Sequence, residues 1–314
     1  MAASVWMPPV KRPDMRLLPL ILAALPLPAL AEDILLSGPP IWESAPLIAL
    51  AESQPVDGVT FTFQPWASPE ELRKRIVADT PLMAVAPSPT AAIFDANGMD
   101  LRVIFATITE GSLSIIGRGA AITDLPDLHG ASLALPFKGY LPDLLMRRIA
   151  EPGAGTWQPQ YTGSLVAGMQ LMLASQVDSA LLAEPMATLA LAQDPSLSRR
   201  ADLCALWRAA TALEDCPPAG VVVVNPAFAG RPAILAAYHS AFAALAADPG
   251  KAAGLLARHF PEMAQSGAGF EHIRPIDLPM PEKADVLDDF YAAILEIEPD
   301  AIGGKLPEPD FYGQ

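Results

Sequence analysis

A strand, a tight loop and a helix follow one another within residues 123–151, and this unit constrains the fold more than any other stretch of the chain. The apolar run 131–135 is bounded by a glycine and a proline, which is typical of a short buried strand. Residues 141–149 place apolar side chains at helical spacing behind a proline suited to the first helical turn. Units of this kind build α/β folds with open, largely parallel sheets.

The loop between this strand and helix carries an aromatic ring, a cation and a flexible glycine, in the order Phe137, Lys138, Gly139 and Tyr140. In an open parallel sheet such a loop lies at the carboxyl end of a strand, where unpaired backbone N–H groups face outward and ligands bind. An ordinary turn with a solvated lysine is the alternative interpretation of the loop alone. The rest of the chain has to decide between the two.

Three similar units precede this one between residues 34 and 98, and the alternation of strand and helix then stops. Thr109, Glu110 and Gly111 join two β-rich runs with no room for a helix. A crossover between parallel strands needs about a dozen residues, so the chain must either turn back or pass into another domain. The second option fits better, because a full set of strand and helix patterns follows the break.

A strongly apolar run at 219–226 is typical of a strand buried on both faces, and it would carry the chain back to the first domain. The residues after it are expected to be helical. We therefore predict an α/β protein of two lobes, each a mixed, mainly parallel sheet flanked by helices. The predicted boundaries are 32–109 and 219–314 for the first lobe and 110–218 for the second.

Residues 1–31 are predicted to be a secretory signal peptide that is cleaved after Ala31. Basic residues precede an apolar run, 17–30, that ends in an A-x-A sequence. The run is short for a bilayer span and is broken by three prolines, so a transmembrane segment is the weaker interpretation. Both Met1 and Met15 fit as the start of translation. We expect the mature protein to be soluble and periplasmic, without direct membrane insertion.

The mature chain is strongly acidic. Removing three basic residues and one acidic residue with the signal leaves 17 Lys and Arg against 34 Asp and Glu, a net charge of −17. Such a surface repels nucleic acid and anionic lipid. The only cysteines, Cys204 and Cys216, would meet an oxidising compartment and are predicted to form a disulfide. Two separate buried thiols are the alternative.

Four stretches of the sequence have the order and spacing of a known family pattern. They are APLIALAES, DLPDLHGASLAL, MLASQVDSALLAEPMATLA and AIGGKLPEPDFY. Together they resemble the periplasmic substrate-binding proteins of ABC importers, in the branch that includes nitrate, sulfonate/taurine and thiamine-precursor binders. The resemblance covers residues 32–314 and departs from the common pattern at Gln176 and Ser179, where glycine and alanine are usual.

This resemblance implies a two-lobed periplasmic binding protein fold of type II, a small-molecule ligand held between the lobes, and an ABC permease in the inner membrane as partner. We expect a monomer that binds no nucleic acid, needs no cofactor or metal and is not an enzyme. The sequence has no H-E-x-x-H, G-x-S-x-G or P-loop motif. The family's enzyme relatives use a cysteine-rich segment that two distant cysteines do not provide. An exported enzyme on the same scaffold and a ligand-sensing partner of a membrane receptor remain alternatives.

The candidate ligand contacts all lie in loops that follow predicted strands or at the crossover between lobes. They are Trp42, Ser44, Trp66, Ser88, Thr109, Glu110, Lys138, Gly139, Tyr140, Thr162 and Glu184. Hydroxyl groups and a lysine suit a small anion or polar ring, and tryptophan suits a flat or apolar body. Glu184 would instead favour an amine or a ring N–H, so the charge of the ligand stays open. A sulfonate, nitrate, a pyrimidine and an aromatic acid all fit.

Overall fold

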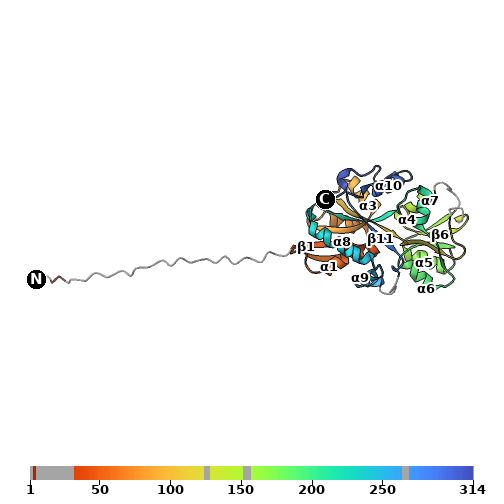
Figure 1. The fold of residues 1–314 in the computed structure, drawn as a ribbon, viewed down its shortest axis with the longest axis horizontal. Helices are drawn as coiled ribbons and strands as arrows, with labels where there is room; N and C mark the ends of the chain where they lie inside the picture. Colours follow the sequence, from red (N-terminus) through yellow and green to blue (C-terminus); the bar gives the residue numbers. More distant parts are fainter. Residues whose placement is uncertain (1–2, 5–31, 124–127, 151–156, 264–268, 314) are drawn as a thin grey trace. The chain divides into compact units, whose positions relative to one another are not determined.

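The computed structural model describes residues 3–4, 32–123, 128–150, 157–263 and 269–313 (Figure 1). Residues 32–314 form one compact unit. The predicted signal peptide, its cleavage after Ala31 and the choice between Met1 and Met15 lie outside the described residues, apart from positions 3 and 4. Within the described part of the chain, no helix is long and apolar enough to cross a membrane.

The first sheet has six strands in the order β11-β4-β10-β3-β1-β2. Four of them run in one direction, and β10 and β11 run in the other. The strands are β1 (Asp33–Gly38), β2 (Thr60–Pro65), β3 (Leu82–Pro87), β4 (Arg102–Glu110), β10 (Pro218–Val224) and β11 (Arg274–Pro279). The helices of this part are α1 (Ala45–Ala51), α2 (Pro69–Ile76), α3 (Ser88–Ala96), α8 (Pro232–Ala246), α9 (Lys251–His259) and α10 (Ala284–Leu295).

The second sheet has five strands in the order β7-β6-β8-β5-β9, and only β5 runs against the others. The strands are β5 (Leu113–Gly117), β6 (Ser132–Pro136), β7 (Gln158–Thr162), β8 (Ser179–Ala183) and β9 (Ser198–Asp202). Its helices are α4 (Leu141–Ala150), α5 (Leu165–Leu173), α6 (Met186–Gln193) and α7 (Leu203–Thr211). The prediction of two mixed, mainly parallel sheets flanked by helices is confirmed.

Two edge strands escape the sequence analysis. The expectation that everything after residue 226 is helical is wrong, because β11 pairs antiparallel with β4. Pro275 and Pro279 lie in β11 and cannot donate to a ladder, which is tolerated only at an edge. β9 reads Ser-Arg-Arg-Ala-Asp, so it lacks the apolar alternation that marks a strand in the sequence. Both strands form because a neighbouring strand offers free hydrogen-bonding groups.

The register of the first sheet brings the carboxyl ends of its parallel strands to one edge. Gly38 and Pro65, the last residues of β1 and β2, are partners. Gly220 of β10 pairs on one side with Pro87 at the end of β3, and on the other with Thr107 near the end of β4. The loops that follow β1, β2 and β3 therefore lie at the edge where β4 leaves the sheet.

The second sheet is arranged in the same way. Pro136 and Thr162, the last residues of β6 and β7, are partners, and Ala183 at the end of β8 pairs with Leu113 at the start of β5. Only two residues separate Leu113 from Glu110 at the end of β4. The carboxyl ends of the parallel strands in both sheets therefore lie beside the crossover, and the two sets of loops face each other.

Apolar packing continues from one lobe to the other. One core cluster takes residues from both sheets, including Ala84 of β3 and Leu133 of β6. The helices α4, α7 and α10 contact one another, and the ring centroids of Trp207 and Phe290 lie 5.6 Å apart. The two lobes therefore share apolar packing at α10 in addition to the crossover strands.

Candidate ligand-binding site

The two loop tryptophans of the first lobe are buried. Trp42 is 2% exposed, and its ring packs edge-on against Phe242 with the centroids 5.3 Å apart. The indole N–H of Trp42 donates to the carbonyl of Pro249 at 3.4 Å. Trp66 is also buried, and its indole N–H donates to the carbonyl of Val85 at 3.0 Å. Each ring thus fills the core of the first lobe and has its polar atom satisfied, so neither indole is exposed as a stacking surface.

The two predicted serines of the first lobe are enclosed as well. The hydroxyl of Ser44 donates to the carbonyl of Pro39 at 2.6 Å, and that of Ser88 donates to the carbonyl of Pro218 at 2.6 Å. Both side chains are fully buried. They tie the first loop and the start of α3 to neighbouring backbone, and a direct role for them in ligand binding stays a prediction.

Thr109, at the end of β4, reaches a carboxylate that the sequence analysis did not select. Its hydroxyl donates to Oε1 of Glu43 at 2.6 Å, and both residues are buried. Removal from water raises the pKa of Glu43, although the hydrogen bond from Thr109 acts in the opposite direction. Gly220 lies against the Glu43 side chain, where an added methyl group would come within 3.0 Å of Cγ. The only sequence signal for Glu43 was its place between Trp42 and Ser44.

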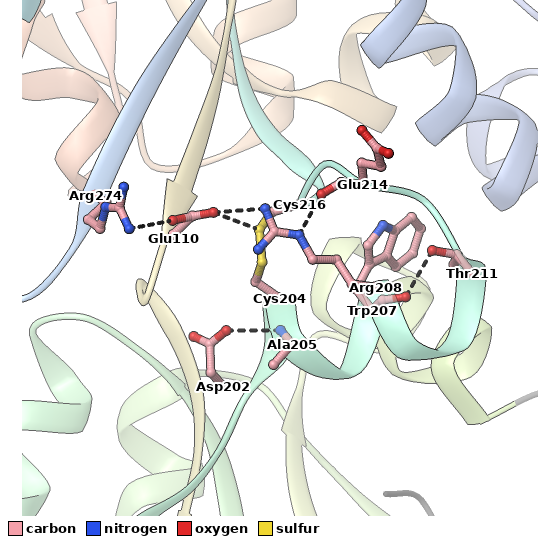
Figure 2. The surroundings of a disulfide bond; sticks show 10 residues. All are labelled: Glu110, Asp202, Cys204, Ala205, Trp207, Arg208, Thr211, Glu214, Cys216 and Arg274. Carbon is pink, nitrogen blue, oxygen red and sulfur yellow. Dashed lines mark hydrogen bonds and ion pairs between the residues drawn. A yellow bond between two sulfur atoms is a disulfide. The ribbon is translucent and has the colours of Figure 1, made fainter. Parts of the chain in front are cut away.

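Glu110 forms the centre of an ion-pair cluster at the crossover (Figure 2). One carboxylate oxygen lies 2.9 Å from Arg208, and the other lies 3.8 Å from Arg274. The predicted disulfide between Cys204 and Cys216 is confirmed and lies beside this carboxylate. Glu110 is therefore placed to hold the crossover together, and the paired sulfur atoms offer no thiolate to a metal.

The second-lobe loop that the sequence selected is exposed, in contrast. Lys138 has its Nζ 5.4 Å from the ring centroid of Tyr161, and Tyr140 is exposed. Gly139 adopts φ 81°, which the tight turn requires and which favours glycine. Its N–H donates to buried Asp143 at 2.7 Å. Thr162 lies at the adjacent strand end, where its hydroxyl donates to the carbonyl of Ser164 at 2.9 Å.

Glu184 is enclosed at the end of β8 by partners from both lobes. Its carboxylate accepts a hydrogen bond from Arg199 of β9 and one from the N–H of Thr188 at 3.2 Å. Nε2 of His272, which precedes β11 of the first sheet, lies 3.0 Å from the same carboxylate. The side chain of Glu184 has no solvent exposure. Arg199 and His272 were not predicted as site residues, because neither follows a recognisable strand or motif in the sequence.

The structure thus divides the predicted contacts into two groups. Loop residues of the first lobe are buried and hydrogen-bonded within that lobe, whereas Lys138, Gly139 and Tyr140 remain accessible at the facing edge of the second. Glu110 and Glu184 are both engaged by arginines. An accessible cation beside aromatic rings suits an anionic or aromatic small molecule.

Solved structures similar to this chain share its two-lobed plan, while neither a protein-family model nor a curated protein matches it. An ABC transporter protein from Parabacteroides distasonis is 21% identical with a TM-score of 0.71, and the match covers 90% of this chain and 98% of that one. The periplasmic aliphatic sulphonate-binding protein SsuA from Escherichia coli is 17% identical, with a TM-score of 0.65 and coverage of 88% and 95%. The desulfurization enzyme DSZB is 12% identical, with a TM-score of 0.58 and coverage of 89% and 95%. Residues 32–314 therefore have the two-lobed fold of periplasmic binding proteins, as the sequence resemblance implied.

Proposed function

We propose that the mature chain is the soluble periplasmic solute-binding component of an ABC importer. It captures a small molecule between the facing strand ends of its two lobes and delivers it to a permease in the inner membrane. The observation that carries this proposal is the register, which brings the carboxyl ends of the parallel strands in both sheets beside one crossover. The proposed lobes are residues 32–109 with 219–314, and 110–218.

An anionic solute is the better-supported choice. Glu184 already faces Arg199 and His272, so its carboxylate is not left for an amine. Among the residues that the structure describes, Lys138 has no ion-pair partner, and its Nζ lies over the ring of Tyr161. A free ammonium at the edge facing the first lobe is suited to a sulfonate, carboxylate or similar group.

The same fold can support an enzyme, since one similar structure is that of the desulfurization enzyme DSZB. This chain has only two cysteines, and both are joined in the disulfide, so neither supplies a thiolate nucleophile. A non-catalytic binding role is consequently the proposed one. Incubation of the protein with its ligand, followed by chromatography, should return the ligand unchanged, and a new product would contradict this assignment.

The direct test is a thermal-shift screen of residues 32–314 against sulfonates, nitrate, pyrimidines and aromatic acids. A ligand at 100 times its Kd should stabilise the folded protein by about 2.7 kcal/mol, because it binds only the native state. Small-angle scattering at saturating ligand should then give a smaller radius of gyration if the lobes close. If no compound of the panel stabilises the protein, or if the radius of gyration is unchanged with every compound that binds, the proposed two-lobed solute-binding function is wrong.

A further inference from the structure

The exposed aromatic side chains of the described residues gather at one edge of the second sheet. Phe137, Tyr140 and Tyr161 are 41%, 51% and 38% exposed, and within the described ranges no other phenylalanine, tyrosine or tryptophan is exposed. The backbone joins their segments, since the N–H of Phe137 donates to the carbonyl of Thr162 at 3.0 Å. We call these three residues the aromatic platform. Exposed apolar surface of this kind marks interaction sites.

The platform is held in a fixed arrangement. Asp143, which is 1% exposed, accepts the N–H of Gly139 at 2.7 Å and the hydroxyl of Tyr161 at 3.0 Å. One buried carboxylate therefore positions both the loop and the third ring. The ring centroids of Phe137 and Tyr140 lie 6.3 Å apart. Phe137 has φ 56°, a left-handed conformation that is uncommon for a residue with a bulky side chain. This backbone conformation does not bury the Phe137 ring, which stays exposed.

A cation completes the platform. Nζ of Lys138 lies 5.4 Å from the ring centroid of Tyr161, within the range of a cation–π contact. That contact does not neutralise the ammonium charge, and no carboxylate of the described residues pairs with it. Rings and a free ammonium on one loop complement a molecule that carries both an aromatic ring and a negative group. The platform lies at the carboxyl ends of β6 and β7, on the same edge of the second sheet as the end of β8, which pairs with the crossover strand β5.

We infer that the solute is a small aromatic anion, a benzene-type or heteroaromatic ring that carries a sulfonate or carboxylate. Its ring lies against Phe137 and Tyr140, and its anionic group pairs with Lys138. This inference rests on the proposed solute-binding function and narrows the class of solute. Aromatic pairs favour an aromatic ring over a saturated ring of equal size.

The test compares benzenesulfonate with cyclohexanesulfonate by calorimetric titration, since the two share a charge and a six-membered ring. Wild-type protein should bind benzenesulfonate about 2- to 10-fold more tightly. In the double variant Phe137→Leu and Tyr140→Leu, this preference should fall to about 1, while cyclohexanesulfonate binding changes little. Val77→Ala serves as the matched control, because it removes an exposed apolar side chain of the first lobe. Benzoate and cyclohexanecarboxylate form a second pair that tests the carboxylate alternative.

Three results would overturn the aromatic class and still leave a solute-binding protein. They are equal affinities within each pair, a preference that survives the double variant, and binding only of nitrate or aliphatic anions. Unchanged affinity for every solute in the double variant would show that the solute does not lie against Phe137 and Tyr140, and this result would also overturn the inference. Failure of the proposed function is a separate result, because no compound of any class would then stabilise the protein or close its lobes.

Discussion

The loops at the two facing edges are built in opposite ways. In the first lobe, Trp42, Trp66 and Ser88 turn inward and satisfy their polar atoms on neighbouring backbone. In the second lobe, Lys138 and Tyr140 stay exposed on a loop that Asp143 holds from beneath. Loops that follow parallel strands thus pack into the core in the first lobe, whereas the corresponding loop of the second lobe keeps its side chains accessible. Substitutions should accordingly separate stability from ligand affinity.

The largest expected effect is on stability, from Trp42→Ala. The substitution empties a buried ring site against Phe242, and such truncations cost about 3–5 kcal/mol. Urea unfolding of the variant should give a midpoint well below that of wild type. Tyr140→Ala, at the exposed edge, should change stability by less than about 0.5 kcal/mol. Similar losses from both variants would remove the contrast between the lobes.

The disulfide beside the crossover is expected to stabilise the fold, as the buried loop residues of the first lobe do. Replacing both Cys204 and Cys216 with alanine should lower the free energy of unfolding by roughly 3 kcal/mol, because the bond closes a loop across 12 positions. In the wild-type protein exported from cells, thiol labelling after denaturation without reductant should find no free cysteine. Two labelled thiols, or a double variant as stable as wild type, would show that the disulfide does not form or does not stabilise the crossover.

Lys138→Ala tests the accessible side. The variant loses a charge-assisted hydrogen bond worth about 1.5–3 kcal/mol, so its affinity for an anionic ligand should fall by about one to two orders of magnitude. Stability should change by less than about 0.5 kcal/mol, since the side chain has no other partner among the described residues. Lys74→Ala, an exposed lysine on α2 of the first lobe, is the control and should leave affinity unaltered.

A cationic ligand would give the opposite pattern of affinities in the variants. If the ligand is a cation held by Glu184, Lys138→Ala should leave affinity unchanged or improve it, while Glu184→Gln weakens it. Calorimetric titration of the two variants with the same ligand separates these cases. An undiminished affinity in Lys138→Ala would remove the anion-binding role of this loop.

The smallest effect is expected from the pH dependence that Glu43 contributes. Burial raises its pKa in the folded state, so at a pH between the unfolded and the folded pKa the native protein holds a proton that the unfolded chain releases. This contribution is complete below the unfolded pKa and is lost as pH rises through the folded pKa, by at most about 1.4 kcal/mol per pH unit. Urea unfolding at pH 5 and pH 8 should therefore show that Glu43→Gln loses less stability than wild type. Glu282→Gln, an exposed control, should follow wild type, and parallel profiles for all three would refute a buried ionising Glu43.

Much of the architecture could be predicted from local patterns. The apolar run 131–135 corresponds to β6 at Ser132–Pro136, and the helical spacing at 141–149 corresponds to α4 at Leu141–Ala150. The short Thr109-Glu110-Gly111 connection correctly indicated passage into a second sheet. These features follow from side-chain periodicity and from the length that a parallel crossover needs, both of which are local properties.

The placement of side chains in the loops depended on distant parts of the chain. Trp42 is covered by Phe242 of α8, about 200 positions later, and Glu184 meets His272 across the lobes. β11 became a strand only because β4 had a free edge. Periodicity identified the loops that follow the strands, but burial is decided by whichever element packs over each loop. For that reason the sequence alone determined the two-lobed α/β plan and the loop that carries Lys138, while only the tertiary structure separated buried side chains that hold the fold from side chains that stay accessible.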